Sequence, residues 1–316
     1  MNDQCNLQLS CMEIWGGNSK VHRRVELDGI NAWVCSVPHG DSEQGGDIHY
    51  MSCCATGRVT RILVADVSGH GVSVAEHAVK LKNMMHRYSN YISQQKLVRD
   101  LNKSFAHYTS EGKFATAVAM TYFSPTGILT YSNAGHPTPF LYEAAVRQWR
   151  LLETSGSSAS DHSGERTDLP FGVIENAVYS QNNVKLEFDD IVLLYTDSLI
   201  DMRGADGKRL GVQGVLKLLQ AMPVEEEHPD PDTLIDKVKT ALFAADSRDK
   251  DQEFDDDVTL LLFSPSMIGG LKWSRRLPGC YCKQQYVQYL PKVNRYPGRN
   301  SVYVTSVVPC LTCSTD

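Results

Sequence analysis

The sequence predicts an α+β protein in which groups of β-strands alternate with pairs of helices. Short apolar runs bounded by turns fill the first part of the chain, and stretches with helical periodicity follow Gly71 and again Gly211. A last β-rich run lies near residue 260. The composition, with 42% hydrophobic and 22% charged residues, is that of a globular protein and excludes disordered, collagen-like and coiled-coil chains.

Three apolar runs before residue 70 have the length of strands, namely 32–37, 48–54 and 61–67. The second and third are predicted to pair, because only a short segment with Gly57 separates them. Within the third run, Ile62-Leu63-Val64-Ala65 is apolar without alternation, as in a strand that is covered on both faces.

Two helices are predicted between Gly71 and Lys113. The apolar residues of the first helix follow a 4-3-4-3-4 spacing, which makes a narrow seam along one side. The second helix carries a broader apolar stripe. The seam consists of Val74, Ala78, Leu81, Met85, Tyr88 and Ile92, and the stripe consists of Leu97, Val98, Leu101, Phe105 and Tyr108.

The second half of the chain is predicted to hold further strands and helices. Residues 116–123 and 128–132 form a hairpin, because Pro125 and Gly127 occupy positions that suit a type I turn. Asp189-Asp190 makes another tight turn, and the Ser- and Gly-rich segment 153–168 is a flexible loop. The remaining predicted elements are strands at 184–188, 191–195 and 258–263 and helices at 212–221 and 233–244.

The character of the chain changes near Ser264. Residues 265–316 lose periodicity and hold seven Lys or Arg residues against one acid, although the whole chain carries a net charge of -6. Paired cysteines in this basic extension either form a zinc site or are incidental residues of a weakly structured tail. These cysteines are Cys280, Cys282, Cys310 and Cys313.

Nothing in the sequence indicates export or membrane insertion. The N-terminus lacks a basic segment followed by an apolar core, and no apolar run approaches the ~20 residues needed to cross a bilayer. We therefore expect a cytoplasmic protein with reduced cysteines and no membrane association. The acidic body argues against nucleic acid as a partner.

Four aspartates share one feature, because each lies at a strand end or beside a glycine turn. Carboxylate oxygens without clustered His or Cys are the ligands of hard cations such as Mg²⁺ or Mn²⁺. An unpaired carboxylate at the end of an apolar strand is otherwise costly. Taken singly, each position also fits a turn, a helix cap or a solvated loop. The four residues are Asp47, Asp66, Asp197 and Asp256.

Five motifs around these aspartates resemble the SpoIIE/RsbU-type phosphatases, the bacterial branch of the metal-dependent type 2C (PPM) serine/threonine protein phosphatases. The motifs stand in the family's order, and the resemblance covers about Asp28 to Ser264. It implies a type 2C phosphatase-like α-β-β-α fold, with a two-sheet β-sandwich flanked by helix pairs and metals at one end. Residues 28–264 would then be the phosphatase domain, preceded by a lead-in at 1–27 and followed by the extension at 265–316. The motifs are Gly45-Gly46-Asp47, 65–71, 133–137, 194–197 and 256–259.

The resemblance also implies the roles of individual residues. Two divalent cations, Mn²⁺ or Mg²⁺, would be bridged by Asp66. His70 could donate a proton to the leaving group, and the alternative is that it is a buried, hydrogen-bonded loop histidine. Asp257 would orient its loop rather than bind metal, and His136 would brace a turn. The implied metal ligands are Asp47, Asp66, the backbone carbonyl of Val67, Asp197 and Asp256, and the implied catalytic residues are Asp66 and His70.

The function implied by the resemblance is hydrolysis of phosphoserine or phosphothreonine on a partner protein by a metal-activated water. By analogy with the family, that partner is an anti-sigma-factor antagonist. A non-catalytic binding module with the same fold is the alternative. A cysteine phosphatase is not expected, because no Gly-rich phosphate loop follows Cys53-Cys54.

Two further features bear on regulation and metal affinity. By the resemblance, the seam at 74–92 could mediate a homodimer, whereas the alternative is that it packs on the protein's own sheet. Since the motifs begin within the first 50 residues, we expect regulation by a separate protein, a dimer or the extension. Ser198 replaces a family glycine, and a positive φ there would strain it by roughly 1 kcal/mol.

Overall fold

The computed structural model describes residues 7–8, 14–40, 42–54, 58–69, 72–109, 112–152, 168–204, 207–222, 236–238, 240–241 and 256–266. The chain divides into two compact units, Met1–Leu271 and Lys272–Asp316, and all described residues belong to the first. Among them, no helix is long and apolar enough to cross a membrane. The predicted zinc site of the extension lies outside the described residues, and the domain boundary at Ser264 stays a prediction.

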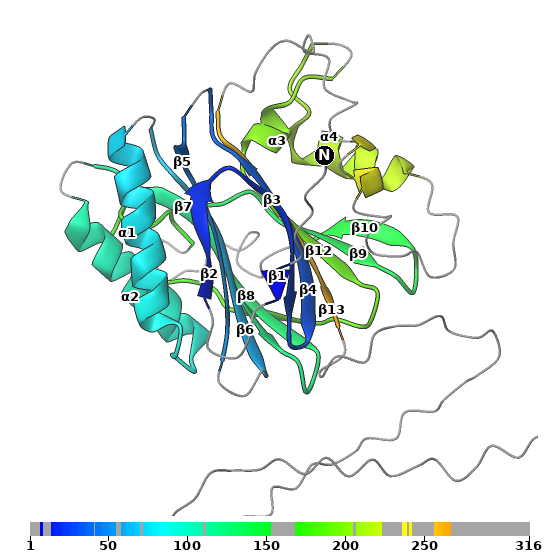
Figure 1. Ribbon diagram of the computed structural model, residues 1–316, viewed down its shortest axis with the longest axis horizontal. Coiled ribbons are helices and arrows are strands. Elements are labelled where there is room, and N and C mark those ends of the chain that lie inside the picture. Colours follow the sequence, from blue (N-terminus) through cyan, green and yellow to red (C-terminus); the bar gives the residue numbers. More distant parts are fainter. Residues whose placement is uncertain are drawn as a thin grey trace, which may run out of the picture. The chain divides into compact units, whose positions relative to one another are not determined.

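Two β-sheets stand face to face in the centre of this unit (Figure 1). Strand neighbours are antiparallel apart from the parallel pair of β1 and β3. The first sheet has the order β1 (Leu7–Gln8), β3 (Val21–Leu27), β4 (Ile30–Val37), β13 (Val258–Pro265), β12 (Ile191–Tyr195), β9 (Phe140–Glu143) and β10 (Gln148–Leu151). The second has the order β11 (Asn182–Lys185), β8 (Ile128–Ala134), β7 (Ala115–Phe123), β6 (Val59–Val67), β5 (Gln44–Cys53) and β2 (Ile14–Ser19).

Three hydrophobic clusters bind the layers together. The first lies between the two sheets and includes Val34, Val64 and Leu261. The second cluster joins the outer face of the second sheet, which contains β5 to β8, to α1 (Val72–Tyr88) and α2 (Gln94–Tyr108). The third joins the outer face of the other sheet to α3 (Ser198–Asp201) and α4 (Gly211–Ala221). The predicted α-β-β-α sandwich is thus confirmed.

The apolar seam of α1 packs on the protein's own sheet. Val74, Ala78, Leu81 and Met85 are buried in the cluster with β5 and β6. Ile92 is 98% exposed and lies beyond the end of α1, so it does not continue the seam. The seam at 74–92 is therefore occupied within one chain, which corrects its use as a homodimer surface.

Most predicted elements are confirmed, including both helices after Gly71 and the hairpin of β7 and β8. Residues 1–27, expected to be a lead-in, contain β2 and β3, which pair with β5 and β4, so the sandwich begins before residue 28. The two strands near the predicted turn at Asp189-Asp190 belong to different sheets, because β11 joins one and β12 the other. Of the predicted helix at 233–244, residues 236–238 are helical, and most of the rest lies outside the described residues.

Candidate metal centre

Asp47 and Asp66 lie opposite each other on neighbouring strands. They are register partners, because β5 begins where its antiparallel neighbour β6 ends. Asp47 is buried, and its Oδ2 accepts a hydrogen bond of 2.8 Å from the Thr196 hydroxyl. Since Thr196 follows β12 of the other sheet, this bond links the two sheets at one end of the sandwich.

Thr196 is fixed in turn by Thr259 at the start of β13. The Thr196 amide donates to the Thr259 carbonyl at 3.1 Å, and the Thr259 amide donates to Thr196 Oγ1 at 2.9 Å. The Thr196 hydroxyl therefore accepts from one strand and donates to the Asp47 carboxylate. The sequence argument missed this role, although both threonines stand beside the predicted aspartates.

The Asp257 carboxylate holds the segment that precedes Asp47. It accepts hydrogen bonds from the backbone amides of His39 at 2.6 Å, of Gly46, and of Asp47 at 3.3 Å. A Cβ built on Gly45 would lie 2.2 Å from Asp257 Oδ2, so only glycine permits this approach. This arrangement is that of a residue that orients the loop.

The aspartates raise one another's pKa values. The pKa of Asp66 is raised to about 7 by burial and by the charges of Asp197, Asp256 and Asp257. Burial and then the charge of Asp66 raise the pKa of Asp47. Burial and then the charge of Asp256 raise the pKa of Asp197. The structure thus brings the four sequence-predicted aspartates to one end of the sandwich.

The Val67 carbonyl lies beside the same loop. A Cβ built on Gly46 would stand 3.0 Å from the Val67 carbonyl oxygen, so the two backbones approach closely. Val67 is the last residue of β6 and directly follows Asp66. His70, the predicted proton donor, lies outside the described residues.

The donor chemistry of this end of the sandwich fits a hard divalent cation, because it consists of carboxylates and a carbonyl. In the described part of the chain, however, no three His, Cys, Asp or Glu side chains form a group that could hold a metal ion as they stand. Carboxylates that share a site repel one another. The residues therefore converge without forming a finished ligand shell.

His136 connects the two sheets just behind the aspartates. Its Nε2 lies 2.9 Å from the Tyr195 carbonyl, and its Nδ1 lies 2.8 Å from the Thr116 hydroxyl. A carbonyl only accepts, so Nε2 carries the proton and Nδ1 accepts from Thr116. Burial lowers the pKa of His136 to about 4, which keeps the ring neutral. Its amide also bonds Asn133 Oδ1, in agreement with the predicted bracing of a turn.

Ser198 is not strained in the way that a positive φ would require. It is the first residue of α3, and the non-glycine residues with positive φ among those described are Arg147, Asp168 and Asp189. The Ser198 hydroxyl donates to the Asp257 carbonyl. The side chain that replaces the family glycine thus joins the Asp197 and Asp257 loops.

The two-sheet sandwich has the fold of a PP2C phosphatase domain. Three solved structures share this fold. The RsbU and RsbW domains of Rv1364c from Mycobacterium tuberculosis match with a TM-score of 0.62 and 22% identity, covering 79% of this chain and 64% of that one. The PP2C phosphatase domain of SpoIIE from Bacillus subtilis matches with a TM-score of 0.57 and 12% identity, covering 81% of this chain and 64% of that one. RsbX in complex with magnesium matches with a TM-score of 0.55 and 15% identity, covering 78% of this chain and 100% of that one.

The family model "Stage II sporulation protein E (SpoIIE)" matches residues 56–265. The chain therefore belongs to the SpoIIE family. The phosphoserine phosphatase RsbP of Bacillus subtilis is 26% identical over 186 residues, which are 57% of this chain and 41% of RsbP. The phosphoserine phosphatase RsbU of the same organism is 24% identical over 147 residues, which are 46% of this chain and 40% of RsbU. The chain thus spans less than half the length of either relative.

Proposed function

We propose that this protein is a metal-dependent protein phosphatase that hydrolyses phosphoserine or phosphothreonine on a partner protein. The observation that carries the proposal is the convergence of Asp47, Asp66, Asp197 and Asp256 from both sheets. An end of a sandwich where carboxylates raise one another's pKa values is suited to binding positive charge. The two relatives named phosphoserine phosphatases support this choice of reaction.

In this proposal, five groups would hold two divalent cations, Mn²⁺ or Mg²⁺, with Asp66 shared between them. When bound, such cations lower the pKa of a water and neutralise charge on the phosphoryl oxygens. The protein's own contribution is to fix the ligands: Thr196 orients the Asp47 carboxylate, and Asp257 holds the backbone before it. The five groups are Asp47, Asp66, the Val67 carbonyl, Asp197 and Asp256.

The substrate proposed from the family resemblance is a phosphorylated anti-sigma-factor antagonist, and His70 is the proposed proton donor to its serine. A homodimer through α1 is not part of the proposal, because the apolar face of that helix is buried. The cytoplasmic location expected from the sequence stays a prediction.

A second candidate is a non-catalytic binding module with the same fold. Hydrolysis of p-nitrophenyl phosphate by the purified chain with and without Mn²⁺ separates the two. The phosphatase predicts Mn²⁺-dependent turnover that is lost in Asp66→Asn and kept in Asp100→Asn, a partly buried acid on α2 outside the proposed site. If the wild-type chain binds Mn²⁺ without turnover, the binding module is the better description.

A further inference from the structure

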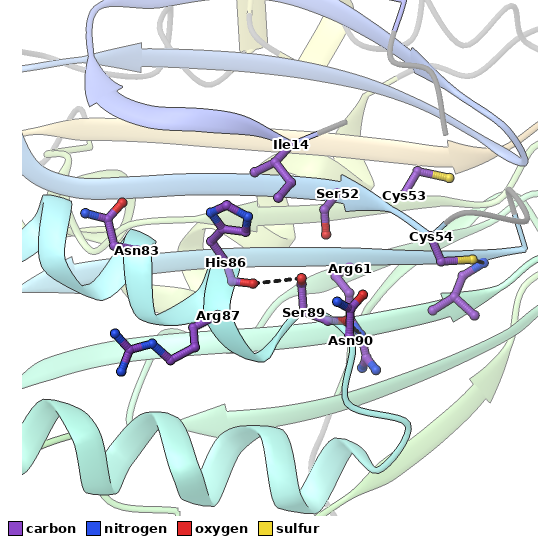
Figure 2. A pocket seen from close by; sticks show the side chains of 11 residues that line it. Ile14, Ser52, Cys53, Cys54, Arg61, Asn83, His86, Arg87, Ser89 and Asn90 are labelled. Carbon is purple, nitrogen blue, oxygen red and sulfur yellow. Dashed lines mark hydrogen bonds between the residues drawn. The ribbon is translucent and has the colours of Figure 1, made fainter. Parts of the chain in front are cut away.

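A second site lies at the end of the sandwich away from the aspartates. It is a cavity of about 510 Å³ between the end of β5, the start of β6 and the last turn of α1 (Figure 2). The register pairs Cys53–Thr60 and Asp47–Asp66 are six residues apart along each strand, or about 20 Å. A ligand in this cavity therefore cannot take part in chemistry at the proposed metal centre.

The lining of the cavity is cationic. It contains two arginines and one histidine, and none of its residues is Asp or Glu. The lining also includes serine and asparagine side chains, which form hydrogen bonds. The lining residues are Ile14, Ser52, Cys53, Cys54, Val59, Arg61, Asn83, His86, Arg87, Ser89 and Asn90.

Arg61 is the anchor of this positive charge. It is only 3% exposed, and the four oxygens that accept its hydrogen bonds are all neutral. Nε donates to the Ser89 carbonyl, Nη1 to Gln94 and Thr121, and Nη2 to the Tyr91 carbonyl. These bonds use four of the five guanidinium hydrogens, so one hydrogen on Nη2 is left for another acceptor.

The Arg61 charge is not balanced by any described carboxylate. Burial lowers its pKa only to about 10, so the guanidinium is charged at neutral pH. Negative charge on Tyr50 or Cys54 would raise the pKa of Arg61 again, but both side chains are neutral at pH 7 in their ordinary forms. A buried charge without a counter-charge is costly, and structures usually pair it.

We propose that this cavity binds a small anion through a phosphate or carboxylate group. Arg61 supplies the buried positive charge, and the exposed Arg87 adds a second charge at the mouth. In Figure 2, Ser89 and Asn90 lie beside Arg61 at the end of α1, while the Arg87 side chain extends along the helix. The volume suits a ligand the size of a small metabolite. The competing explanation is that Arg61 only fastens the α1–α2 turn through its bonds to Ser89 and Tyr91.

The test uses the full chain in chelator, so that the metal centre cannot hold the probe. Sodium sulfate, standing for a phosphate group, and sodium succinate, standing for a dicarboxylate, are each titrated against sodium chloride at equal ionic strength. We expect saturable amide NMR shifts at Ser52, Ser89 and Asn90 with a dissociation constant of about 1 mM or tighter for one of the two probes. The probe that saturates identifies which anionic group the cavity prefers.

Charge reversal at the mouth provides the matched comparison. Arg87→Glu should weaken binding at least about tenfold, because a carboxylate replaces a cation beside the anion. Arg99→Glu, the same change at an exposed position of α2, should alter it less than about twofold. The proposal is overturned if neither probe gives saturable shifts, if the shifts centre on Asp47 and Gly69, or if the two variants behave alike. Any of these results would leave Arg61 as the fastener of the turn.

Discussion

Replacing Asp66 by Asn should stabilise the metal-free protein at alkaline pH. In the folded protein, Asp66 keeps its proton up to a pKa of about 7, whereas the unfolded chain loses it near 3.8. The folded state therefore binds more protons between these values, and its free energy of unfolding falls as the pH rises through them. Asparagine does not ionise, so its side chain does not lower the free energy of unfolding of the variant as the pH rises.

The magnitude follows from the shift. A change from 3.8 to about 7 corresponds to about 4 kcal/mol when fully expressed above pH 7, and to less than half of that at pH 5. Entry of water and relaxation of the loops reduce both values, so we expect about 2 kcal/mol at pH 8 and less than about 1 kcal/mol at pH 5. For a domain of this size, about 2 kcal/mol raises the melting temperature by about 4–8 °C.

The assay is thermal unfolding in EDTA at pH 5 and pH 8, followed by circular dichroism. Asp100→Asn, which removes a partly buried acid paired with Arg99, serves as the control and should not show the gain of Asp66→Asn. Added Mn²⁺ should raise the melting temperature of the wild type and not that of Asp66→Asn. An equal gain at both pH values would refute the electrostatic argument, and a loss at pH 8 would make Asp66 a structural residue.

Three other predictions concern the metal ions, the residues after Ser266 and His136. EDTA should abolish turnover of p-nitrophenyl phosphate and Mn²⁺ or Mg²⁺ should restore it; full turnover in metal-free buffer would contradict the carboxylate site. Removal of residues 267–316 should leave a folded, active domain, because the described strands of the sandwich end at Pro265 and the last backbone hydrogen bond among the described residues is from Ser266 to Gly29 at 2.9 Å; urea unfolding and turnover of the truncated protein check this. His136→Phe should lower the free energy of unfolding by about 1–3 kcal/mol, because it leaves the Thr116 hydroxyl and the Tyr195 carbonyl without their partner; unchanged urea unfolding would show that His136 does not brace the sheets.

The convergence of the aspartates could be predicted because the end of a strand is visible in the sequence as the end of an apolar run. Asp66 and Asp197 both close such runs, and the structure brings them together. The strand β2 was missed because Gly16 and Gly17 interrupt its apolar pattern. Ile92 was assigned to the seam because heptad spacing continues past Tyr88, although α1 ends there.

Contacts between distant segments were the part that no local pattern could show. The bond from Thr196 to Asp47 spans 149 residues, and no spacing rule connects a threonine after one strand to an aspartate in another sheet. The cationic cavity was missed for the same reason. Arg61 looks like an ordinary polar residue beside an apolar run, and its burial depends on α1 and α2 covering it.

The place of β13 in its sheet has a consequence for synthesis of the protein. β13 is the last strand along the described part of the chain, yet it lies between β4 and β12 and pairs with both. Until the ribosome has released it, the two older strands have open edges toward each other, and Asp256, Asp257 and Thr259 are missing from the acidic end. A nascent chain can therefore fold the sheet that contains β5 to β8 early, but the proposed metal centre stays incomplete until β13 is inserted. Unfinished chains carry exposed strand edges that invite aggregation or chaperone binding.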